Sequence, residues 1–277
     1  MTPDEYCQHK AAASGSSFYY AFLFLPPERR RAITALYAFC REVDDAVDGA
    51  SDPQLARAKL DWWRAEISHL HAGSPQHPVM RALAPAAADF GVNAERLNEI
   101  VDGMQMDLDQ SRYLDFKGLE RYCYHVAGVV GILSAGIFGY SDPRTLEYAT
   151  QLGTAFQLTN IIRDVGEDAR KNRIYLPMED LKAHGVTASD ILNARYSDAF
   201  AALMRFQAAR AQSYYERALA ALPPADRRAQ RPGLIMAAIY RALLDEIERD
   251  GFLVLDRRTS LTPLRKLWLA WKTWVAA

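Results

Sequence analysis

The chain has 277 residues, half of them hydrophobic, and its 33 basic and 34 acidic residues nearly cancel. That length suits one large hydrophobic core, close to the upper size of a single domain. A formal net charge of −1 gives no reason to expect nucleic acid as a partner, so any charge specificity must be local.

The first residues, the hydropathy and the cysteines of the sequence predict the cellular compartment. The three cysteines are odd in number and lack CxxC spacing, which favours a reduced protein. The first ten residues lack the pattern of a secretory signal, and no run of about 18 apolar residues occurs. We therefore expect a cytoplasmic protein without a membrane-spanning helix.

Most of the sequence reads as a row of helices. Apolar residues recur every three or four positions, Pro27 and Pro143 stand at helix starts, and no stretch alternates as a strand would. Neither an internal repeat nor a linker is visible, so a single all-α domain over 1–277 is predicted. Helices are expected at 28–48, 53–71, 79–90, 93–110, 116–138, 143–170, 178–183, 187–194, 197–221 and 232–250, with an amphipathic segment at 264–277.

Two of these helices carry acids on a face that should be buried. In the helix after Pro27, the apolar stripe runs through Tyr37 and Cys40. At about 100° per residue, Asp44 and Asp48 continue that stripe. Carboxylates on a core-facing stripe are costly unless they are paired or bind a metal.

The second acidic helix repeats this arrangement. Gln157, Asn160, Asp164 and Asp168 follow one another on one face, whereas isoleucine, leucine, valine and phenylalanine fill the rest. A helix that is apolar nearly all round is buried. A polar strip on such a helix is expected to line a cavity.

A divalent cation would let these acids face one another. Two carboxylates 4 Å apart repel by about 4 kcal/mol at an effective dielectric of 20. All the candidate ligands are oxygens, which favours Mg²⁺ over zinc and also admits Mn²⁺. The predicted metal ligands are Asp44, Asp48, Asn160, Asp164 and Asp168.

Basic residues around the acids predict a phosphate ligand. Arg41 precedes the first pair by one turn, and Arg163, Arg170, Lys171 and Arg173 surround the second motif. Open positions on Mg²⁺ are usually filled by phosphate oxygens, and arginine binds phosphate from the other side. The site is therefore expected to hold a diphosphate at the mouth of an apolar cavity that suits a long hydrocarbon.

Loss of a diphosphate from such a chain would leave a carbon cation. Aromatic faces stabilise a cation by about 0.5 to 2 kcal/mol each. Tyr37, Tyr124, Phe156 and Tyr175 are the candidates. The segment 168–177 that follows the second motif could close as a lid that excludes water.

Five blocks of the sequence resemble, in order, those of the squalene/phytoene synthase family. They are SGSSFYYAF (14–22), YAFCREVDDAVD (37–48), YCYHVAGVVG (122–131), LGTAFQLTNIIRDVGEDARKNRIYLP (152–177) and YRALLDEIERDGF (240–252). The resemblance implies an all-α isoprenoid synthase fold with a central apolar cavity. It also implies head-to-head condensation of two prenyl diphosphates with Mg²⁺.

The resemblance assigns roles residue by residue. Some relatives carry a histidine and a serine just before the SF pair, where Ser14 and Gly15 stand here, so Ser16 could supply the amino-terminal phosphate contact. A tyrosine hydroxyl or the departing diphosphate could take the final proton. The candidate catalytic residues are Tyr124, Arg163 and Tyr175, and the candidate substrate-binding residues are Ser16, Ser17, Tyr37, Arg41, Gln157, Arg173, Tyr240 and Arg257.

Three products remain open at this point. The third and fourth blocks look most like the bacterial presqualene diphosphate synthases of hopanoid pathways, which implies two farnesyl diphosphates as substrates and pyrophosphate as the second product. The alternatives are a phytoene synthase acting on geranylgeranyl diphosphate and a squalene synthase using NADPH. NADPH is not expected, because no GxGxxG follows a strand.

Other classes fit less well. A carboxylate di-metal bundle needs two ExxH motifs, and only Glu66 to His69 supplies one. A non-catalytic helical scaffold would not explain two buried acidic stripes. The segment 264–277 could lie on the inner face of a membrane or simply pack on the domain. Downstream enzymes of the same pathway are candidate partners.

Overall fold

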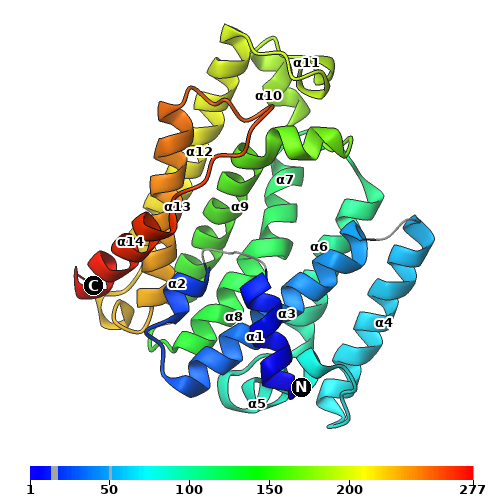
Figure 1. Ribbon diagram of the computed structural model, residues 1–277, viewed down its shortest axis with the longest axis vertical. Coiled ribbons are helices and arrows are strands. Elements are labelled where there is room, and N and C mark those ends of the chain that lie inside the picture. Colours follow the sequence, from blue (N-terminus) through cyan, green and yellow to red (C-terminus); the bar gives the residue numbers. More distant parts are fainter. Residues whose placement is uncertain (14–17, 50–51, 277) are drawn as a thin grey trace.

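The computed structural model describes residues 1–13, 18–49 and 52–276 (Figure 1). Across these residues the regular structure is helical, apart from one isolated β-bridge between Arg112 and Ile174. The predicted all-α class is confirmed. The elements are α1 (Pro3–Ala13), α2 (Phe18–Phe22), α3 (Pro27–Asp48), α4 (Pro53–His71), α5 (Pro78–Phe90), α6 (Ala94–Asp109), α7 (Phe116–Cys123), η1 (Tyr124–Gly128), α8 (Val129–Phe138), α9 (Arg144–Arg170), α10 (Met178–Ala183), α11 (Ala188–Leu192), α12 (Asp198–Ala221), η2 (Pro224–Asp226), α13 (Arg231–Arg249) and α14 (Pro263–Ala276).

Local sequence signals place most helix ends within a residue or two of the predicted positions. Pro27 is the first residue of α3, where a missing N–H costs nothing. Asp52 and Asn93 accept hydrogen bonds from backbone N–H groups at the starts of α4 and α6. Gly91 ends α5 at a φ of 70°, a left-handed conformation that favours glycine.

Helices α1 and α2, the short η2 and an interruption of the helix at 116–138 were not predicted. Helix α1 lacks a clear apolar stripe, because Cys7 is its one buried residue. Residues 116–138 are not one regular helix, since η1 is a π-helical segment between α7 and α8. By length and composition 116–138 could cross a membrane, contrary to the expectation of no such segment, although buried core helices pass the same test.

Helix α9 runs through the middle of the bundle (Figure 1). It packs against α12, α8, η1 and α13, whereas α3 packs against α1, α4, α5 and α6. Residues from α2, α3, η1, α8, α9 and α13 line an apolar cavity. The structure thus has the predicted helical bundle with a central cavity, and both acidic helices form part of the cavity wall.

Candidate active site

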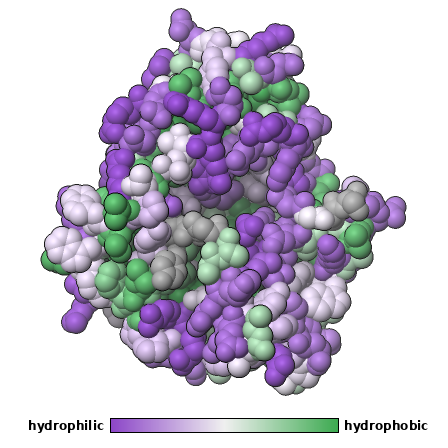
Figure 2. Space-filling model, viewed as in Figure 1, coloured by the Kyte–Doolittle hydropathy of each residue, from purple (hydrophilic) through white to green (hydrophobic). Residues whose placement is uncertain are grey.

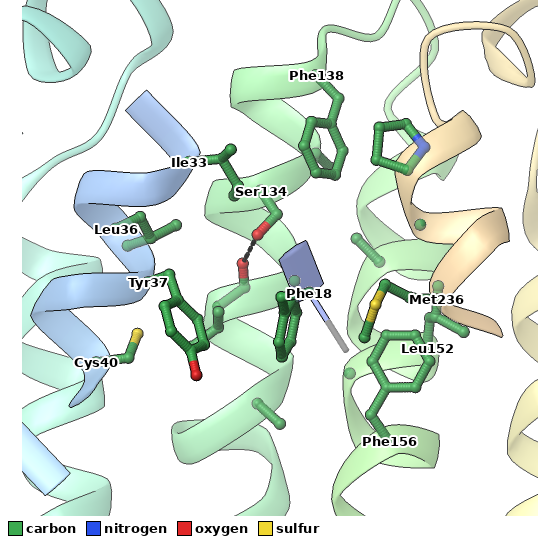
Figure 3. A pocket seen from close by; sticks show the side chains of 18 of the residues that line it. Phe18, Ile33, Leu36, Tyr37, Cys40, Ser134, Phe138, Leu152, Phe156 and Met236 are labelled. Carbon is green, nitrogen blue, oxygen red and sulfur yellow. Dashed lines mark hydrogen bonds between the residues drawn. The ribbon is translucent and has the colours of Figure 1, made fainter. Parts of the chain in front are cut away.

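The cavity lies between α3 on one side and α9 with α13 on the other. Figure 3 shows Leu36 and Tyr37 of α3 pointing toward the same space as Leu152 and Phe156 of α9, with Met236 of α13 next to the last two. These side chains make the wall mainly hydrocarbon and aromatic. A wall of this kind binds apolar chains and keeps water away.

The cavity becomes polar where α9 turns to its acidic strip. Gln157 and Asn160 both line it. The amide of Asn160 donates to Oε1 of Gln157 at 3.4 Å, but the Oδ1 atom of Asn160 is buried and has no hydrogen-bond partner among the described residues. A buried carbonyl oxygen without a donor is costly. It is therefore available to a ligand.

The carboxyl ends of α3 and α9 meet. Just beyond α9, Lys171 Nζ lies 2.7 Å from one oxygen of Asp48, and Arg173 Nη1 lies 2.9 Å from the other. Burial favours the neutral acid, but the hydrogen bonds from these two cations outweigh it and lower the pKa of Asp48. Asp48, at the end of the first motif, is thus joined to the loop that follows the second.

Asp44 lies one turn earlier on α3 and is paired with Arg41. Arg41 Nη1 is 2.7 Å from Asp44 Oδ2, and Nη2 is 3.0 Å from Oδ1 of Asp45. Burial raises the pKa of Asp44, and the neighbouring Asp48 and Asp45 add to this effect, although Arg41 opposes it. An acid that is desolvated and crowded by other acids attracts additional positive charge.

Asp164 is partly buried and lies between two arginines. Arg163 Nε donates to it at 2.7 Å, and Arg258 Nε donates to the same oxygen at 2.8 Å. Arg257, the predicted contact, instead pairs with Asp250 at 3.5 Å and is half exposed. The structure therefore places Arg258, which sequence reasoning missed, at the second motif in place of its neighbour.

The carboxyl group of Asp168, the last acid of the strip, has no hydrogen-bond or ion-pair partner among the described residues, although its backbone carbonyl accepts from the N–H groups of Lys171 and Arg173. Burial and repulsion from Asp164 raise its pKa to about 7, although Lys171 and Arg173 act in the opposite direction. A desolvated carboxylate without a partner is an open ligand position for a cation.

Asp107 on α6 is a further acid that sequence reasoning missed. Its two oxygens accept hydrogen bonds from the hydroxyls of Tyr175 at 2.8 Å and Tyr122 at 3.0 Å. Burial raises its pKa to about 6. The signal was in the sequence, because Asp107 lies three and seven residues after the buried Met104 and Ile100 and so continues the apolar stripe of α6.

The remaining candidates divide into two groups. Tyr37 and Tyr240 line the cavity, with the Tyr240 ring 4.8 Å from that of Phe156. Tyr124 does not line it, because its hydroxyl is bound by Arg96 of α6 at 2.8 Å. The candidates Ser16 and Ser17 lie outside the described residues, as do the departures at 14 and 15.

Comparison with known proteins agrees with this geometry. A family model described as squalene/phytoene synthase matches residues 11–265. The chain belongs to the squalene/phytoene synthase family. It is 37% identical to a chloroplastic phytoene synthase of an Oncidium hybrid cultivar, covering 91% of this chain and 62% of the relative. It is 36% identical to a 15-cis-phytoene synthase of Synechocystis sp., covering 96% and 84%.

Solved structures of family members share the fold. A dehydrosqualene synthase bound to a ligand is 29% identical, with a TM-score of 0.88 over 99% of this chain and 96% of that one. Squalene synthase HpnC from Alicyclobacillus acidocaldarius is 29% identical, with a TM-score of 0.80 over 90% and 94%. The chain spans only 62–63% of the plant relatives it matches first.

In this member of the squalene/phytoene synthase family, the expected lid is held in place. Backbone N–H groups of Ile174 and Met178 donate to the carbonyls of Ser111 and Tyr113 at 3.0 and 2.8 Å. Arg112 also binds the carbonyl oxygen of Asn172 at 2.6 Å. These bonds hold 168–177 against residues 111–113, and its role as a lid stays a prediction.

The chemical type of the donor atoms suits a hard cation such as Mg²⁺. All five predicted ligands offer oxygen, and the side-chain oxygens of Asn160 and Asp168 lack protein partners within the described chain. No cluster of three or more His, Cys, Asp or Glu in the described residues is arranged to hold one ion. The acids that pair with arginine and lysine would have to turn toward a metal, and metal binding stays a prediction.

Proposed function

We propose that this protein joins two prenyl diphosphates head to head (1′-1) and releases pyrophosphate. The observation that carries the proposal is that two acidic helices and several basic side chains meet at the polar end of one apolar cavity. Carboxylates and cations together suit a diphosphate with its counter-ions, and the cavity suits hydrocarbon chains. Mg²⁺ held by the two motifs would neutralise diphosphate charge and so improve it as a leaving group.

The protein's own residues would then act on two substrates. Arg41, Lys171 and Arg173 hold phosphate oxygens, and their charge stabilises the departing diphosphate. The allylic cation that remains is attacked by the double bond of the second prenyl chain. Transfer of one proton from the resulting cation to the departing diphosphate or to a tyrosine hydroxyl closes a cyclopropane ring. The faces of Phe156 and Tyr240 stabilise the cation while the apolar wall excludes water.

The chain length of the substrate is the finer part of the proposal. The curated relatives named above are phytoene synthases, which supports geranylgeranyl diphosphate better than the farnesyl diphosphate that the sequence blocks favoured. We therefore place the twenty-carbon substrate first. Farnesyl diphosphate is the second candidate, because the dehydrosqualene synthase and HpnC structures align over nine tenths of this chain or more.

The test is a product assay with both substrates. The purified protein is incubated with farnesyl or geranylgeranyl diphosphate and Mg²⁺, with and without NADPH, and pyrophosphate and the lipid product are measured by mass spectrometry. A C40 cyclopropyl diphosphate or phytoene supports the first reading, and a C30 cyclopropyl diphosphate or squalene supports the second. If neither farnesyl nor geranylgeranyl diphosphate yields pyrophosphate, the proposal is contradicted.

Two variants connect that assay to the site. Asp44→Asn and Asp164→Asn should abolish turnover and leave helicity by circular dichroism intact, because each removes a charge that a metal would use. Asp89→Asn, at an exposed position on α5, is the matched control and should turn over normally. Near-normal turnover in either site variant would remove that residue from the metal site.

A further inference from the structure

The largest group of exposed apolar side chains is on α14. Of the fourteen large hydrophobic residues exposed in the described chain, five lie on this helix. We call them the outer face of α14: Leu264, Leu267, Trp268, Trp271 and Val275. Four of them follow one another at intervals of three or four residues, so they form one stripe on the helix.

Contacts with neighbouring elements hold α14 in place, so its outer face has a defined orientation. On the inner side Ala270 is fully buried, and the ring of Trp274 stacks on Phe24 at 4.9 Å with Arg231 over it at 4.8 Å. Arg265 is bound to Glu246 of α13 at 2.5 Å. These contacts fix which side of α14 points outward, and it is the apolar one.

The segment that carries the outer face contains charges of one sign, although Arg257, Arg258 and Arg265 are paired with acids of other segments. From residue 257 to residue 276 the sequence has five basic residues and no acidic one. Lys272 is exposed and lies over the Trp268 ring at 5.0 Å, without a carboxylate partner in the described chain. Figure 2 shows pale and apolar surface beside purple along the edge that α14 occupies in Figure 1.

We propose that the outer face of α14 docks on an anionic lipid bilayer. Tryptophan prefers the boundary between headgroups and acyl chains, leucine and valine enter the acyl region, and lysine binds anionic headgroups. A second copy of the chain fits less well, because two such faces would bring like charges together. Exposed apolar surface of this extent on one helix marks a binding site.

The position of the outer face suggests that docking helps prenyl substrates and products to reach and leave the cavity. This role rests on the proposed function. Helix α14 packs on α2 and α13. Phe18 and Phe22 of α2, with Met236 and Tyr240 of α13, line the cavity. Helix α14 therefore packs directly on two helices that form the cavity wall. A prenyl substrate or an apolar product could pass between bilayer and cavity with little exposure to water.

The test is flotation of the full chain with vesicles of phosphatidylcholine alone or with 30% phosphatidylglycerol. We expect binding that needs phosphatidylglycerol and weakens in 0.5 M NaCl, because exposed charge pairs are screened. Trp268→Ser with Trp271→Ser should lower the partition coefficient more than about tenfold, since both indoles lose apolar burial. Lys272→Glu should remove most of the dependence on anionic lipid.

A matched pair of single variants distinguishes loss of membrane binding from misfolding. Leu264 and Leu114 are both 80% exposed, but Leu114 lies far along the chain in the loop after α6. Leu264→Ser should weaken flotation, and Leu114→Ser should not. No flotation of the wild type, or equal flotation of all variants, overturns the proposal. A wild-type dimer in light scattering that the Trp variants dissociate, without flotation, assigns the face to a second copy instead.

Measuring pyrophosphate release in detergent tests the proposed function independently of membrane docking. Substrates dissolved in detergent do not require a bilayer, so variants of the outer face should keep pyrophosphate release while they lose flotation. Loss of flotation with full turnover supports the docking face and leaves the chemistry standing. Flotation without any turnover supports the docking face and contradicts the chemistry.

Discussion

Gly153 lies where α9 passes closest to the π-helical segment η1, at one wall of the cavity. A Cβ atom at this position would overlap the carbonyl group of Ala127 and lie 3.0 Å from Cα of Gly128. Both neighbours are backbone, so they cannot rotate away. Gly131 makes the reciprocal contact, because its Cβ would overlap the carbonyl of Ala149. The two helices can approach this closely only while both positions are glycine.

The free energy of unfolding of Gly153→Ala follows from two opposing effects. Alanine in place of glycine inside a helix stabilises by about 1 kcal/mol. Forcing one carbon into a filled contact costs about 1 to 3 kcal/mol, and a backbone neighbour puts this case at the upper end. The net loss is about 1 to 2 kcal/mol, which lowers the melting temperature by about 2 to 8 °C for a chain of this size.

The assay is guanidinium unfolding followed by circular dichroism, with Gly118→Ala as the control. In α7 a Cβ at position 118 would meet two side-chain atoms and no backbone atom: an oxygen of Asp115 at 3.3 Å and a ring carbon of Tyr113 at 3.7 Å. This variant should therefore be unchanged or up to about 1 kcal/mol more stable. The same substitution thus has opposite effects at two helical sites. If both variants gain stability alike, α9 and η1 do not touch as described.

The remaining predictions concern single side chains. Asp107→Asn should lower kcat at least about tenfold with unchanged helicity, because Tyr175 loses its charged acceptor. Arg258→Gln should raise KM for the prenyl diphosphate about tenfold, whereas Arg257→Gln should change it less than about twofold. Asp226 accepts four hydrogen bonds that lower its pKa to about 2. Because the folded pKa is below the unfolded one, the stability lost in Asp226→Asn, about 1 to 2 kcal/mol at pH 7, should disappear as the pH falls from about 4 to 2 in urea unfolding.

Helix ends could be predicted because their causes are local. A proline at a first turn, a side chain that caps a backbone N–H, or a glycine at positive φ acts over a few residues, and all three occur here. The π-helical segment at 124–128 has no such signal. Its neighbour in space is Gly153, which is 25 positions further along the chain than Gly128, so tertiary packing rather than local sequence determines that part of the helix.

The acidic strips could be predicted because helical periodicity places acids on buried faces. That reasoning brought Asp48 and the second motif to the same end of the cavity, as the contacts of Lys171 and Arg173 show. It would also have found Asp107, had the same test been applied to α6, where no second acid repeats the spacing on the stripe. A repeated motif is easy to notice, whereas a single buried acid needs its helix face worked out.

The two arginines at 257 and 258 mark the limit of such reasoning. The segment after α13 has no helical period, so neighbouring side chains can point to opposite sides and sequence position does not determine which one faces α9. The structure fixes the choice through the backbone: the N–H of Gly166 donates to the carbonyl of Val254 at 3.1 Å. A Cβ at position 166 would overlap the Leu255 carbonyl, so this glycine lets the segment lie directly on α9. Arg258 then reaches Asp164, and Arg257 turns back to Asp250. One glycine in the second motif thus allows the close approach in which Arg258, and not Arg257, reaches Asp164.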